Sequence, residues 1–285
     1  MVQILDGLKV SESVLEQVKK DVVELEVEGI MPKLVVVVVG EDPGSQVYVG
    51  HKEKACKNVG ILFEKRAFDA SISQEDLIKV VEELNEDKSV HGFIVQLPLP
   101  KHISVPLINK AIDPRKDVDG FTAYNLGKMF ISQEFEDMAP CTPKGIIKIL
   151  DYYNVDVSGM DAVVVGRSNI VGKPIASMLL NRGATVAVCH SKTKNLTVYT
   201  KWADLLVVAA GVPNLINEDM VKEGSVIIDV GMNRLENGKL CGDVNFDTVK
   251  DKVAAITPVP GGVGPMTVAC LMESVAVAAR KQTKK

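Results

Sequence analysis

The sequence predicts an α/β fold made of two successive α/β units. Short apolar strands alternate with helical segments along the chain, and this alternation is typical of parallel sheets joined by right-handed crossovers. Several strands are continuous runs of β-branched residues, as expected for sheets that helices cover on both faces. A chain of 285 residues is long enough for one large or two ordinary α/β domains.

The first unit is expected to alternate helices and strands up to residue 100. Gly29 and Gly60 end its first two helices, and the segment Leu97-Pro-Leu-Pro100 ends its last strand, because proline cannot continue the interior of a sheet. The predicted elements are a helix over residues 10–29, a strand over 34–39, a helix over 45–58 capped by Ser45, a strand over 61–68, an amphipathic helix opened by Ser71 or Ser73, and a strand over 91–96.

The second unit is expected to begin at Pro140-Cys-Thr-Pro143, with a helix running to about Tyr153. Asn237-Gly238 is a hairpin-turn signal. Residues 258–265 are rich in glycine and proline and predict an irregular loop, followed by a final helix over 266–285 with a basic tail. The predicted strands cover residues 163–165, 185–189, 205–209 and 226–230.

Residues 161–174 predict a buried strand, a glycine turn and the start of a helix, an arrangement that binds a nucleotide diphosphate. Gly166 permits a tight turn, and Gly172 permits a close approach of backbone to phosphate or of strand to helix. The helix is expected to aim its unpaired N–H groups at the anion. The spacing differs from GxGxxG, so an ordinary strand-turn-helix of an α/β fold stays an alternative.

The next strand indicates which nucleotide binds. It ends in His190-Ser191-Lys192-Thr193-Lys194, without the acidic residue that NAD sites place there for the ribose hydroxyls. A carboxylate ~4 Å from a 2′-phosphate would cost roughly 4 kcal/mol per charge pair at an effective dielectric near 20. Its absence favours NADP, and Arg167 could add a fork-shaped phosphate contact. The two lysines are equally well explained as solvated surface charge.

Tyr48 and Lys52 lie four residues apart on a predicted helix, so both project from one face. Tyr-x-x-x-Lys is also found in short-chain dehydrogenases, but there the nucleotide turn precedes the tyrosine, whereas here it follows by a whole domain. A tyrosine and a lysine on a helix usually reflect packing and a solvated charge. Gln96 and Asp119, at strand-end or loop positions where α/β proteins build sites, favour a functional role instead.

Composition excludes several classes of protein. A formal net charge of −4 with scattered basic residues gives no case for nucleic-acid binding. We expect no membrane span, because no apolar run approaches the roughly 20 residues that a span needs. The N-terminus lacks a signal-peptide pattern, which points to the cytosol. The five cysteines are dispersed and predict buried, reduced thiols. The four histidines form no close pair, so no metal site is predicted.

Seven segments of the chain resemble motifs of the bifunctional methylenetetrahydrofolate dehydrogenase/methenyltetrahydrofolate cyclohydrolase family, and they follow one another in the same order as in that family. The set covers nearly the whole chain and shows no departure from the family motifs. The segments are residues 45–56, 95–100, 116–121, 140–145, 166–174, 190–193 and 257–267. The resemblance implies oxidation of 5,10-methylenetetrahydrofolate by NADP⁺ and hydrolysis of the methenyl product to 10-formyltetrahydrofolate.

The resemblance also implies roles for four residues of the first unit. Tyr48 would stack on the folate ring, and Lys52 would serve the cyclohydrolase step and help hydride transfer. Gln96 would hydrogen-bond the lysine, and Asp119 would bind the pterin. A free lysine titrates at about 10.4, so one that exchanges protons near neutrality needs a lowered pKa, obtainable by burial. As alternatives, Gln96 could merely cap a strand, and Asp119 could stabilise its own Asp-Gly turn.

On the cofactor side the resemblance implies contacts of NADP with a further set of residues. Met232 would lie near the nicotinamide through its backbone, although its side chain alone would suggest core. The loop 260–264 would bring nicotinamide toward folate, since glycines let a planar ring approach the backbone closely. The implied NADP contacts are Gly166, Arg167, Ser168, Gly172, His190, Ser191, Met232, Gly261 and Gly262.

The resemblance implies two α/β domains with the folate cleft between them. Residues 1–140 would form the N-terminal folate-binding domain, completed by a C-terminal helix over 266–285, and residues 141–265 the Rossmann-like NADP domain. It also implies a homodimer formed through the nucleotide domain. Two alternatives stay open: a dehydrogenase without the cyclohydrolase step, and a non-catalytic NADP-sensing protein, against which the set Tyr48, Lys52, Gln96 and Asp119 speaks.

Overall fold

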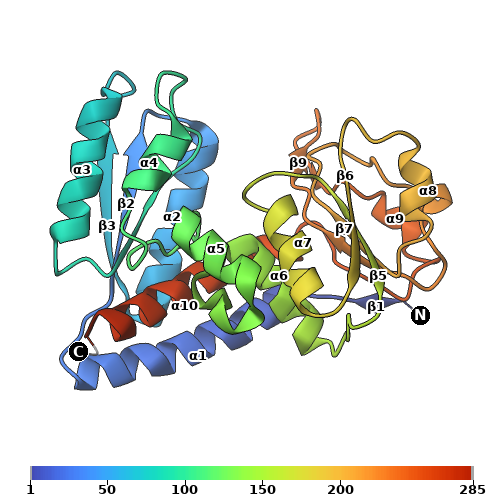
Figure 1. Cartoon of the computed structure of the whole chain (residues 1–285), viewed down its shortest axis with the longest axis horizontal. Coiled ribbons are helices and arrows are strands. Elements are labelled where there is room, and N and C mark those ends of the chain that lie inside the picture. Colours follow the sequence, from blue (N-terminus) through green and yellow to red (C-terminus); the bar gives the residue numbers. More distant parts are fainter. Residues whose placement is uncertain (1, 284–285) are drawn as a thin grey trace. The chain divides into compact units, whose positions relative to one another are not determined.

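The computed structural model of the chain describes residues 2–283, which cluster into two compact units. Unit 1 contains residues 2–12, 129–135 and 142–267, and unit 2 contains residues 13–128, 136–141 and 268–283. Figure 1 labels the elements of both units. The first twelve residues group with unit 1 because the N-terminal strand pairs there, whereas the functional division at residue 140 stays a prediction.

Unit 1 is built on a parallel six-stranded sheet in the order β1-β11-β8-β7-β5-β6. The chain passes from β5 outward to β6 and then returns to the other side of β5 with β7. The carboxyl ends of β5 and β7 therefore form the topological switch point, where open α/β sheets bind ligands. The strands are β1 (Gln3–Ile4), β5 (Asp161–Val165), β6 (Thr185–Cys189), β7 (Leu205–Val208), β8 (Val226–Asp229) and β11 (Ala255–Ile256).

Short helices and a hairpin complete unit 1. Buried residues of the sheet, including Val163, Leu206 and Ile227, form one cluster with Val249 and Val253 from the segment around α9. The predicted hairpin turn is present, with Leu235 N–H donating to the Lys239 carbonyl at 2.9 Å. The elements are α6 (Cys141–Tyr152), α7 (Gly172–Asn181), α8 (Leu196–Thr200), the 3₁₀ turn η2 (Glu218–Met220), β9 (Asn233–Arg234), β10 (Leu240–Cys241) and α9 (Phe246–Val249).

Unit 2 carries a parallel three-stranded sheet in the order β3-β2-β4. One face is covered by α3 and α4, because Val35, Val37 and Val39 of β2 pack with Leu77 and Val81 of α3 (Figure 1). The elements are β2 (Lys33–Val39), α2 (Pro43–Val59), β3 (Leu62–Phe68), α3 (Gln74–Glu86), β4 (Gly92–Val95) and α4 (Val105–Ala111). The helix α5 (Ala123–Ile131) and the 3₁₀ turn η1 (Gln133–Met138) belong partly to unit 2 and partly, through residues 129–135, to unit 1.

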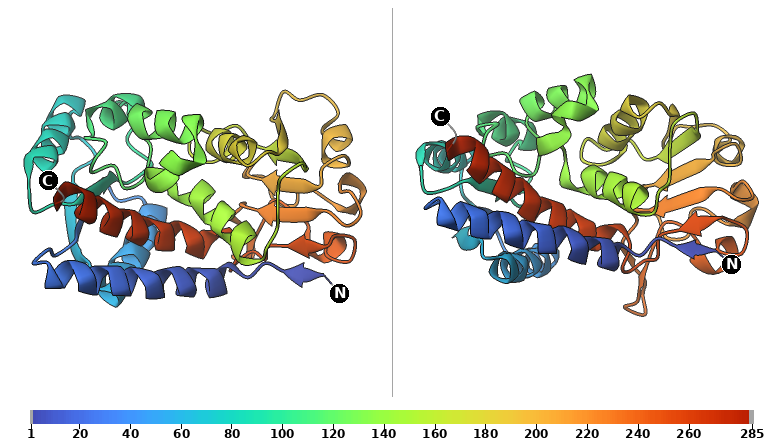
Figure 2. Two further views of the ribbon diagram at one scale, coloured as in Figure 1. Left: turned by 60° about the horizontal axis from the view of Figure 1, so that its bottom comes forward. Right: turned by 90° about the horizontal axis from the view of Figure 1, so that it is seen from below.

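Two long helices, α1 (Gly7–Val27) and α10 (Val263–Thr283), start in unit 1 and continue in unit 2. Within unit 2 they lie side by side, joined by a 2.9 Å ion pair between Arg280 and Glu24 (Figure 2). On its other side α10 reaches α2, where the Cys56 and Met272 sulfurs are 3.5 Å apart.

The predicted start of the last helix was wrong, because α10 begins at Val263, inside the predicted loop over 258–265. Residues 284–285, part of the predicted basic tail, lie outside the described residues. Among residues 2–283, α10 is the one helix long and apolar enough to cross a membrane, contrary to the expectation that no apolar run reaches that length. Most of the apolar stretch of this helix is buried inside the structure, and this burial explains why the helix is rich in apolar residues.

Candidate active site

Helix α2 presents two of the predicted site residues, Tyr48 and Lys52. Its cap is Asp42, whose carboxylate accepts the Ser45 N–H at 2.7 Å, so the predicted capping role of Ser45 was wrong. The Ser45 hydroxyl instead donates to the Leu97 carbonyl at 3.1 Å and joins the start of α2 to the segment after β4. Lys52 is 9% exposed and Tyr48 is 43% exposed, so one turn of helix offers a buried amine and an accessible ring.

Gln96 lies directly after β4 and holds the Lys52 amine. Its side-chain Oε1 accepts from Lys52 Nζ at 2.7 Å, and its Nε2 donates to the Leu97 carbonyl at 2.8 Å. Because the amide NH₂ is occupied, the oxygen is the end that faces the lysine. An oxygen acceptor suits both the charged and the neutral amine, so the contact positions Lys52 in either protonation state.

The environment of Lys52 shifts its titration. Burial lowers the pKa of Lys52, and the Asp119 carboxylate opposes that shift. Burial likewise raises the pKa of Asp119, while Lys52 lowers it. Each group is therefore displaced toward its neutral form by desolvation and held toward its charged form by the other. A lysine in this setting exchanges its proton more readily at neutral pH than a solvated one.

The loop that carries Asp119 is held by a different carboxylate, Asp117. Asp117 is 2% exposed and accepts the Gly120 N–H at 2.9 Å, the Thr122 N–H at 2.8 Å and the Asn125 Nδ2 at 2.9 Å. The turn is therefore stabilised by Asp117, which weakens the alternative that Asp119 serves only its own Asp-Gly turn. The sequence contains both Asp117 and Asp119 but did not indicate that the two have different roles.

Cys141, at the start of α6, is a neighbour of the site that the residue patterns did not single out. Cys141 is 1% exposed, its thiol donates to the Val118 carbonyl at 3.3 Å, and its proximity lowers the pKa of Asp119. Four of the five cysteines are buried, as predicted, and Cys241 is partly exposed. The Pro-Cys-Thr-Pro motif marks the start of this helix in the sequence, but the position of Cys141 beside Lys52 and Asp119 is set by the fold.

In unit 1 the glycine turn after β5 is as tight as its sequence predicts. Gly166 has φ 129°, and a Cβ there would lie 2.2 Å from the Ala209 carbonyl oxygen, which follows β7. A Cβ on Gly172 would lie 2.2 Å from the Gly166 oxygen. Both glycines are therefore required by close packing of the protein backbone at the switch point.

The expectation that α7 aims unpaired N–H groups at an anion was wrong. The Gly172 N–H donates to the Ser168 hydroxyl at 3.3 Å, the Lys173 N–H to the Ser168 carbonyl at 3.0 Å, and the Ile175 N–H to the Val171 carbonyl at 2.9 Å. By contrast, no hydrogen bond joins the backbone N–H groups of residues 167–170 to another group of the described chain, and these four residues are exposed. Successive backbone amides of this kind bind anions, so this loop is the better candidate for phosphate contacts.

The end of β6 brings His190 and Ser191 to the glycine turn. Val165 is in register with Cys189, and the Gly166 N–H donates to the Cys189 carbonyl at 2.8 Å. The His190 N–H bonds the Thr193 hydroxyl at 2.8 Å, closing a small turn that leaves Ser191 exposed. Ser191 and the exposed Arg167 thus follow neighbouring strands at one edge of the sheet.

The remaining predicted cofactor residues, Met232, Gly261 and Gly262, lie on two loops of unit 1. Met232 is 44% exposed, so it is no core residue. A Cβ on Gly264 would lie 2.8 Å from the Met232 methyl, which places this side chain against the glycine loop. The loop is anchored by the Leu8 N–H, which donates to the Gly261 carbonyl at 3.1 Å.

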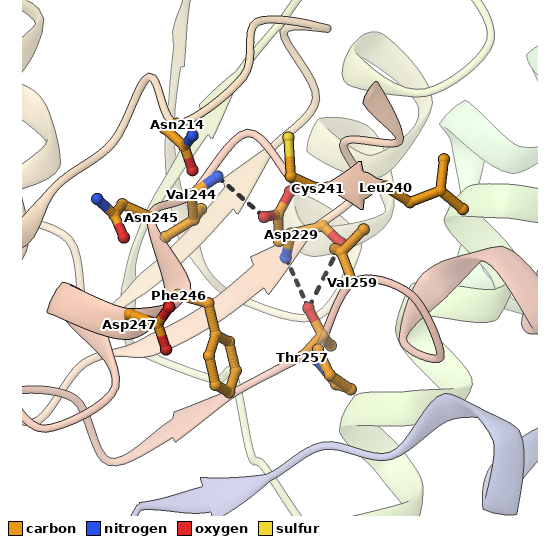
Figure 3. Close-up of a pocket in the computed structure, with 12 residues that line it drawn as sticks. Asn214, Asp229, Leu240, Cys241, Val244, Asn245, Phe246, Asp247, Thr257 and Val259 are labelled. Atoms are coloured by element: carbon orange, nitrogen blue, oxygen red, sulfur yellow. Dashed lines mark hydrogen bonds between the residues drawn. The ribbon is translucent and has the colours of Figure 1, made fainter. Parts of the chain in front are cut away.

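A cavity of about 310 Å³ adjoins this region of unit 1 (Figure 3). Asp229, Cys241, Val244 and Thr257 are among the residues that line it, and Asp229 is joined by hydrogen bonds to Val244 and Thr257. None of the predicted NADP residues lines it.

The chain matches both domains of one protein family. Residues 5–119 match the catalytic domain of tetrahydrofolate dehydrogenase/cyclohydrolase, and residues 140–283 match its NAD(P)-binding domain. The chain is 52% identical over 282 residues to the bifunctional protein FolD of Campylobacter fetus subsp. fetus, and the alignment covers 99% of each protein.

Solved structures agree with the sequence matches. The chain superimposes on the crystal structure of a bifunctional methylenetetrahydrofolate dehydrogenase/cyclohydrolase from Campylobacter jejuni with a TM-score of 0.96, at 49% identity and with 99% of each chain covered. It also resembles the Trypanosoma brucei dehydrogenase-cyclohydrolase solved with NADP cofactor and an inhibitor, with a TM-score of 0.95, 34% identity, and 100% of this chain and 99% of that chain covered.

Proposed function

Because the chain belongs to the tetrahydrofolate dehydrogenase/cyclohydrolase family, we propose that it oxidises 5,10-methylenetetrahydrofolate with NADP⁺ and hydrolyses the methenyl product to 10-formyltetrahydrofolate. The observation that carries this proposal is the buried Lys52 amine, bonded to Gln96 at 2.7 Å, with burial lowering its pKa beside Asp119. A proton-exchanging amine is what the hydrolytic step needs.

In the dehydrogenase step the protein supplies binding and orientation. NADP⁺, when bound, accepts a hydride at C4 of its nicotinamide, and no protein acid is required for that transfer. The backbone N–H groups of the exposed residues 167–170 would bind phosphate oxygens, with Arg167 and Ser191 holding the 2′-phosphate at the neighbouring strand ends. Met232 and the loop with Gly261 and Gly262 would position the nicotinamide.

In the cyclohydrolase step water attacks the methenyl carbon and must lose a proton. Lys52 Nζ in its neutral form would take up that proton and return it to the ring nitrogen that leaves as the ring opens, while the remaining hydroxyl proton passes to solvent as the formyl C=O forms. Gln96 Oε1 would fix the direction of the amine. Asp119 would accept two hydrogen bonds from the amino-pyrimidine edge of the pterin. The exposed ring of Tyr48 would stack on the folate.

One assay tests the proposal and separates it from its alternatives. The purified chain is given methylenetetrahydrofolate with NADP⁺ or NAD⁺, and reduced dinucleotide, methenyl and formyl products are followed. Formation of the formyl product with preference for NADP⁺ is expected. Accumulation of the methenyl product would indicate a dehydrogenase without the hydrolytic step, and NADP⁺ binding without turnover would indicate a sensor. A cytoplasmic homodimer is part of the proposal, supported by the family resemblance.

A further inference from the structure

Unit 1 holds two buried carboxylates that neither proposed step uses. Asp229, the last residue of β8, is 3% exposed, and Asp243, just after β10, is 0% exposed. Burial raises the pKa of Asp229 to about 6, which shows that keeping its charge there costs free energy. A carboxylate retained at such a cost calls for an explanation in terms of what it holds.

Asp229 holds the two ends of the β9–β10 hairpin together. Its carboxylate accepts the Gly231 N–H at 2.9 Å on one side of the hairpin, and the Asp243 N–H at 3.0 Å and the Val244 N–H at 2.9 Å on the other. The bond to Val244 is visible in Figure 3, at the wall of the cavity.

Asp243 joins the same hairpin to the loop after β7. Its carboxylate accepts the N–H groups of Ala210 at 2.6 Å, Gly211 at 2.8 Å and Val212 at 2.9 Å, and the side-chain amide of Asn233 at 2.8 Å. Two carboxylates thus receive seven hydrogen bonds and connect the segments that follow β7 and β8.

Glycines make room for both carboxylates. A Cβ on Gly242 would lie 1.8 Å from Asp229 Oδ2, and a Cβ on Gly231 would lie 2.4 Å from Asp243 Oδ1. The backbone therefore approaches each carboxylate so closely that these positions admit no side chain without a shift.

Met232 lies between two residues that the carboxylates hold. Gly231 is bound through its N–H by Asp229, and Asn233 is bound through its side chain by Asp243. The Met232 methyl in turn contacts the position of Gly264 in the glycine loop. The place of Met232 against that loop is consequently set from both sides.

We propose that Asp229 and Asp243 are positioning residues for hydride transfer, which fix Met232 and the loop 210–212 so that the nicotinamide is held in a reactive orientation. The inference rests on the proposed function, because that function places Met232 beside the nicotinamide. Hydride transfer is sensitive to such placement, since a misplacement of about 1 Å can cost on the order of 100-fold in rate.

The test compares Asp243→Asn and Asp229→Asn with the unmodified chain in both activities. An amide offers one acceptor oxygen and turns donors toward N–H groups, so the loops lose their anchor. We expect KM for NADP⁺ to rise on the order of tenfold, from loss of charged hydrogen bonds. With substrate deuterated at the methylene carbon, the isotope effect on the dehydrogenase rate should increase. Hydrolysis of supplied methenyltetrahydrofolate, which needs no dinucleotide, should stay within about twofold.

Two further variants keep the test decisive. Asp247→Asn changes a carboxylate that lines the same cavity but whose side chain is 88% exposed, and it should leave both activities unchanged. Asn233→Ala removes one of the seven bonds while sparing both carboxylates, so it replaces the aspartate variants if these fold poorly. It should raise KM for NADP⁺ by a smaller factor than is expected for the aspartate variants.

Two results would overturn the inference. One is an unchanged KM for NADP⁺ and an unchanged isotope effect in both aspartate variants. The other is a parallel fall of both activities at unchanged KM and isotope effect, which would mean a merely structural role. An unmodified chain without dehydrogenase activity would refute the proposed function itself, whereas a loss confined to the variants leaves that function intact.

Discussion

At the scale of single residues, Lys52 is the side chain on which the hydrolytic step depends. Replacement by Met keeps the length of the stem and its packing but removes the amine. We expect Lys52→Met to lower the rate of methenyltetrahydrofolate hydrolysis by about 10²-fold or more, the usual contribution of a positioned acid or base. Lys54→Met, two residues away on the exposed face, is the matched control. Hydrolysis at the unmodified rate in Lys52→Met would refute the role.

The pH dependence of hydrolysis follows from the same side chain. Burial lowers the pKa of Lys52, and the neutral amine becomes more abundant as pH rises through that pKa. The hydrolysis rate should therefore increase with pH and level off below about 10.4, where a free lysine titrates. Asp119 raises the pKa of Lys52, so Asp119→Asn should move the inflection to lower pH. A pH–rate profile at saturating folate measures both effects, and an inflection moved to higher pH contradicts the pairing.

Ser191 is the residue at which the choice of dinucleotide can be tested. A carboxylate introduced there would repel a 2′-phosphate by up to roughly 4 kcal/mol at an effective dielectric near 20, with solvent screening reducing the effect. Ser191→Asp should therefore raise KM for NADP⁺ far more than KM for NAD⁺ in steady-state assays. Equal changes for both dinucleotides would place the 2′-phosphate elsewhere.

At the scale of elements, the loop over residues 116–122 depends on Asp117. Asp117→Asn weakens at least three hydrogen bonds to a buried carboxylate, so the free energy of unfolding should fall by about 1–3 kcal/mol. Because the same loop carries Asp119, folate affinity should decrease while NADP⁺ affinity stays the same. Urea unfolding and binding titrations measure these effects, and a variant with unaltered folate affinity would separate Asp117 from the folate site.

Long elements were predictable because their patterns are strong. The valine run of β2 and the amphipathic α3 lie within a few residues of their predicted bounds. Two-residue strands such as β1 and β11 carry no periodicity, and they form because tertiary packing brings their backbones together. The start of α10 was missed because Val263 and Gly264 look like loop residues until their packing in the fold is known.

At the scale of the whole molecule, family motifs predicted Lys52, Gln96 and Asp119, and the structure brings Lys52 into contact with Gln96 and into electrostatic contact with Asp119. Sequence could not predict which carboxylates hold loops, because Asp117, Asp229 and Asp243 bind backbone N–H groups that are set by the fold. The same limit applies to the amides of α7, which Ser168 and Val171 occupy.

The central claim of the proposed function is that a hydride passes directly from the folate to NADP⁺. Both site assignments depend on it, the folate site proposed for unit 2 and the NADP⁺ site proposed for unit 1. The most direct measurement uses methylenetetrahydrofolate deuterated at the transferred position and mass analysis of the NADPH formed. Deuterium should appear in the nicotinamide without dilution by solvent hydrogen, and the unlabelled substrate should give none. NADPH that carries solvent hydrogen, or a chain that forms no NADPH, would contradict the claim.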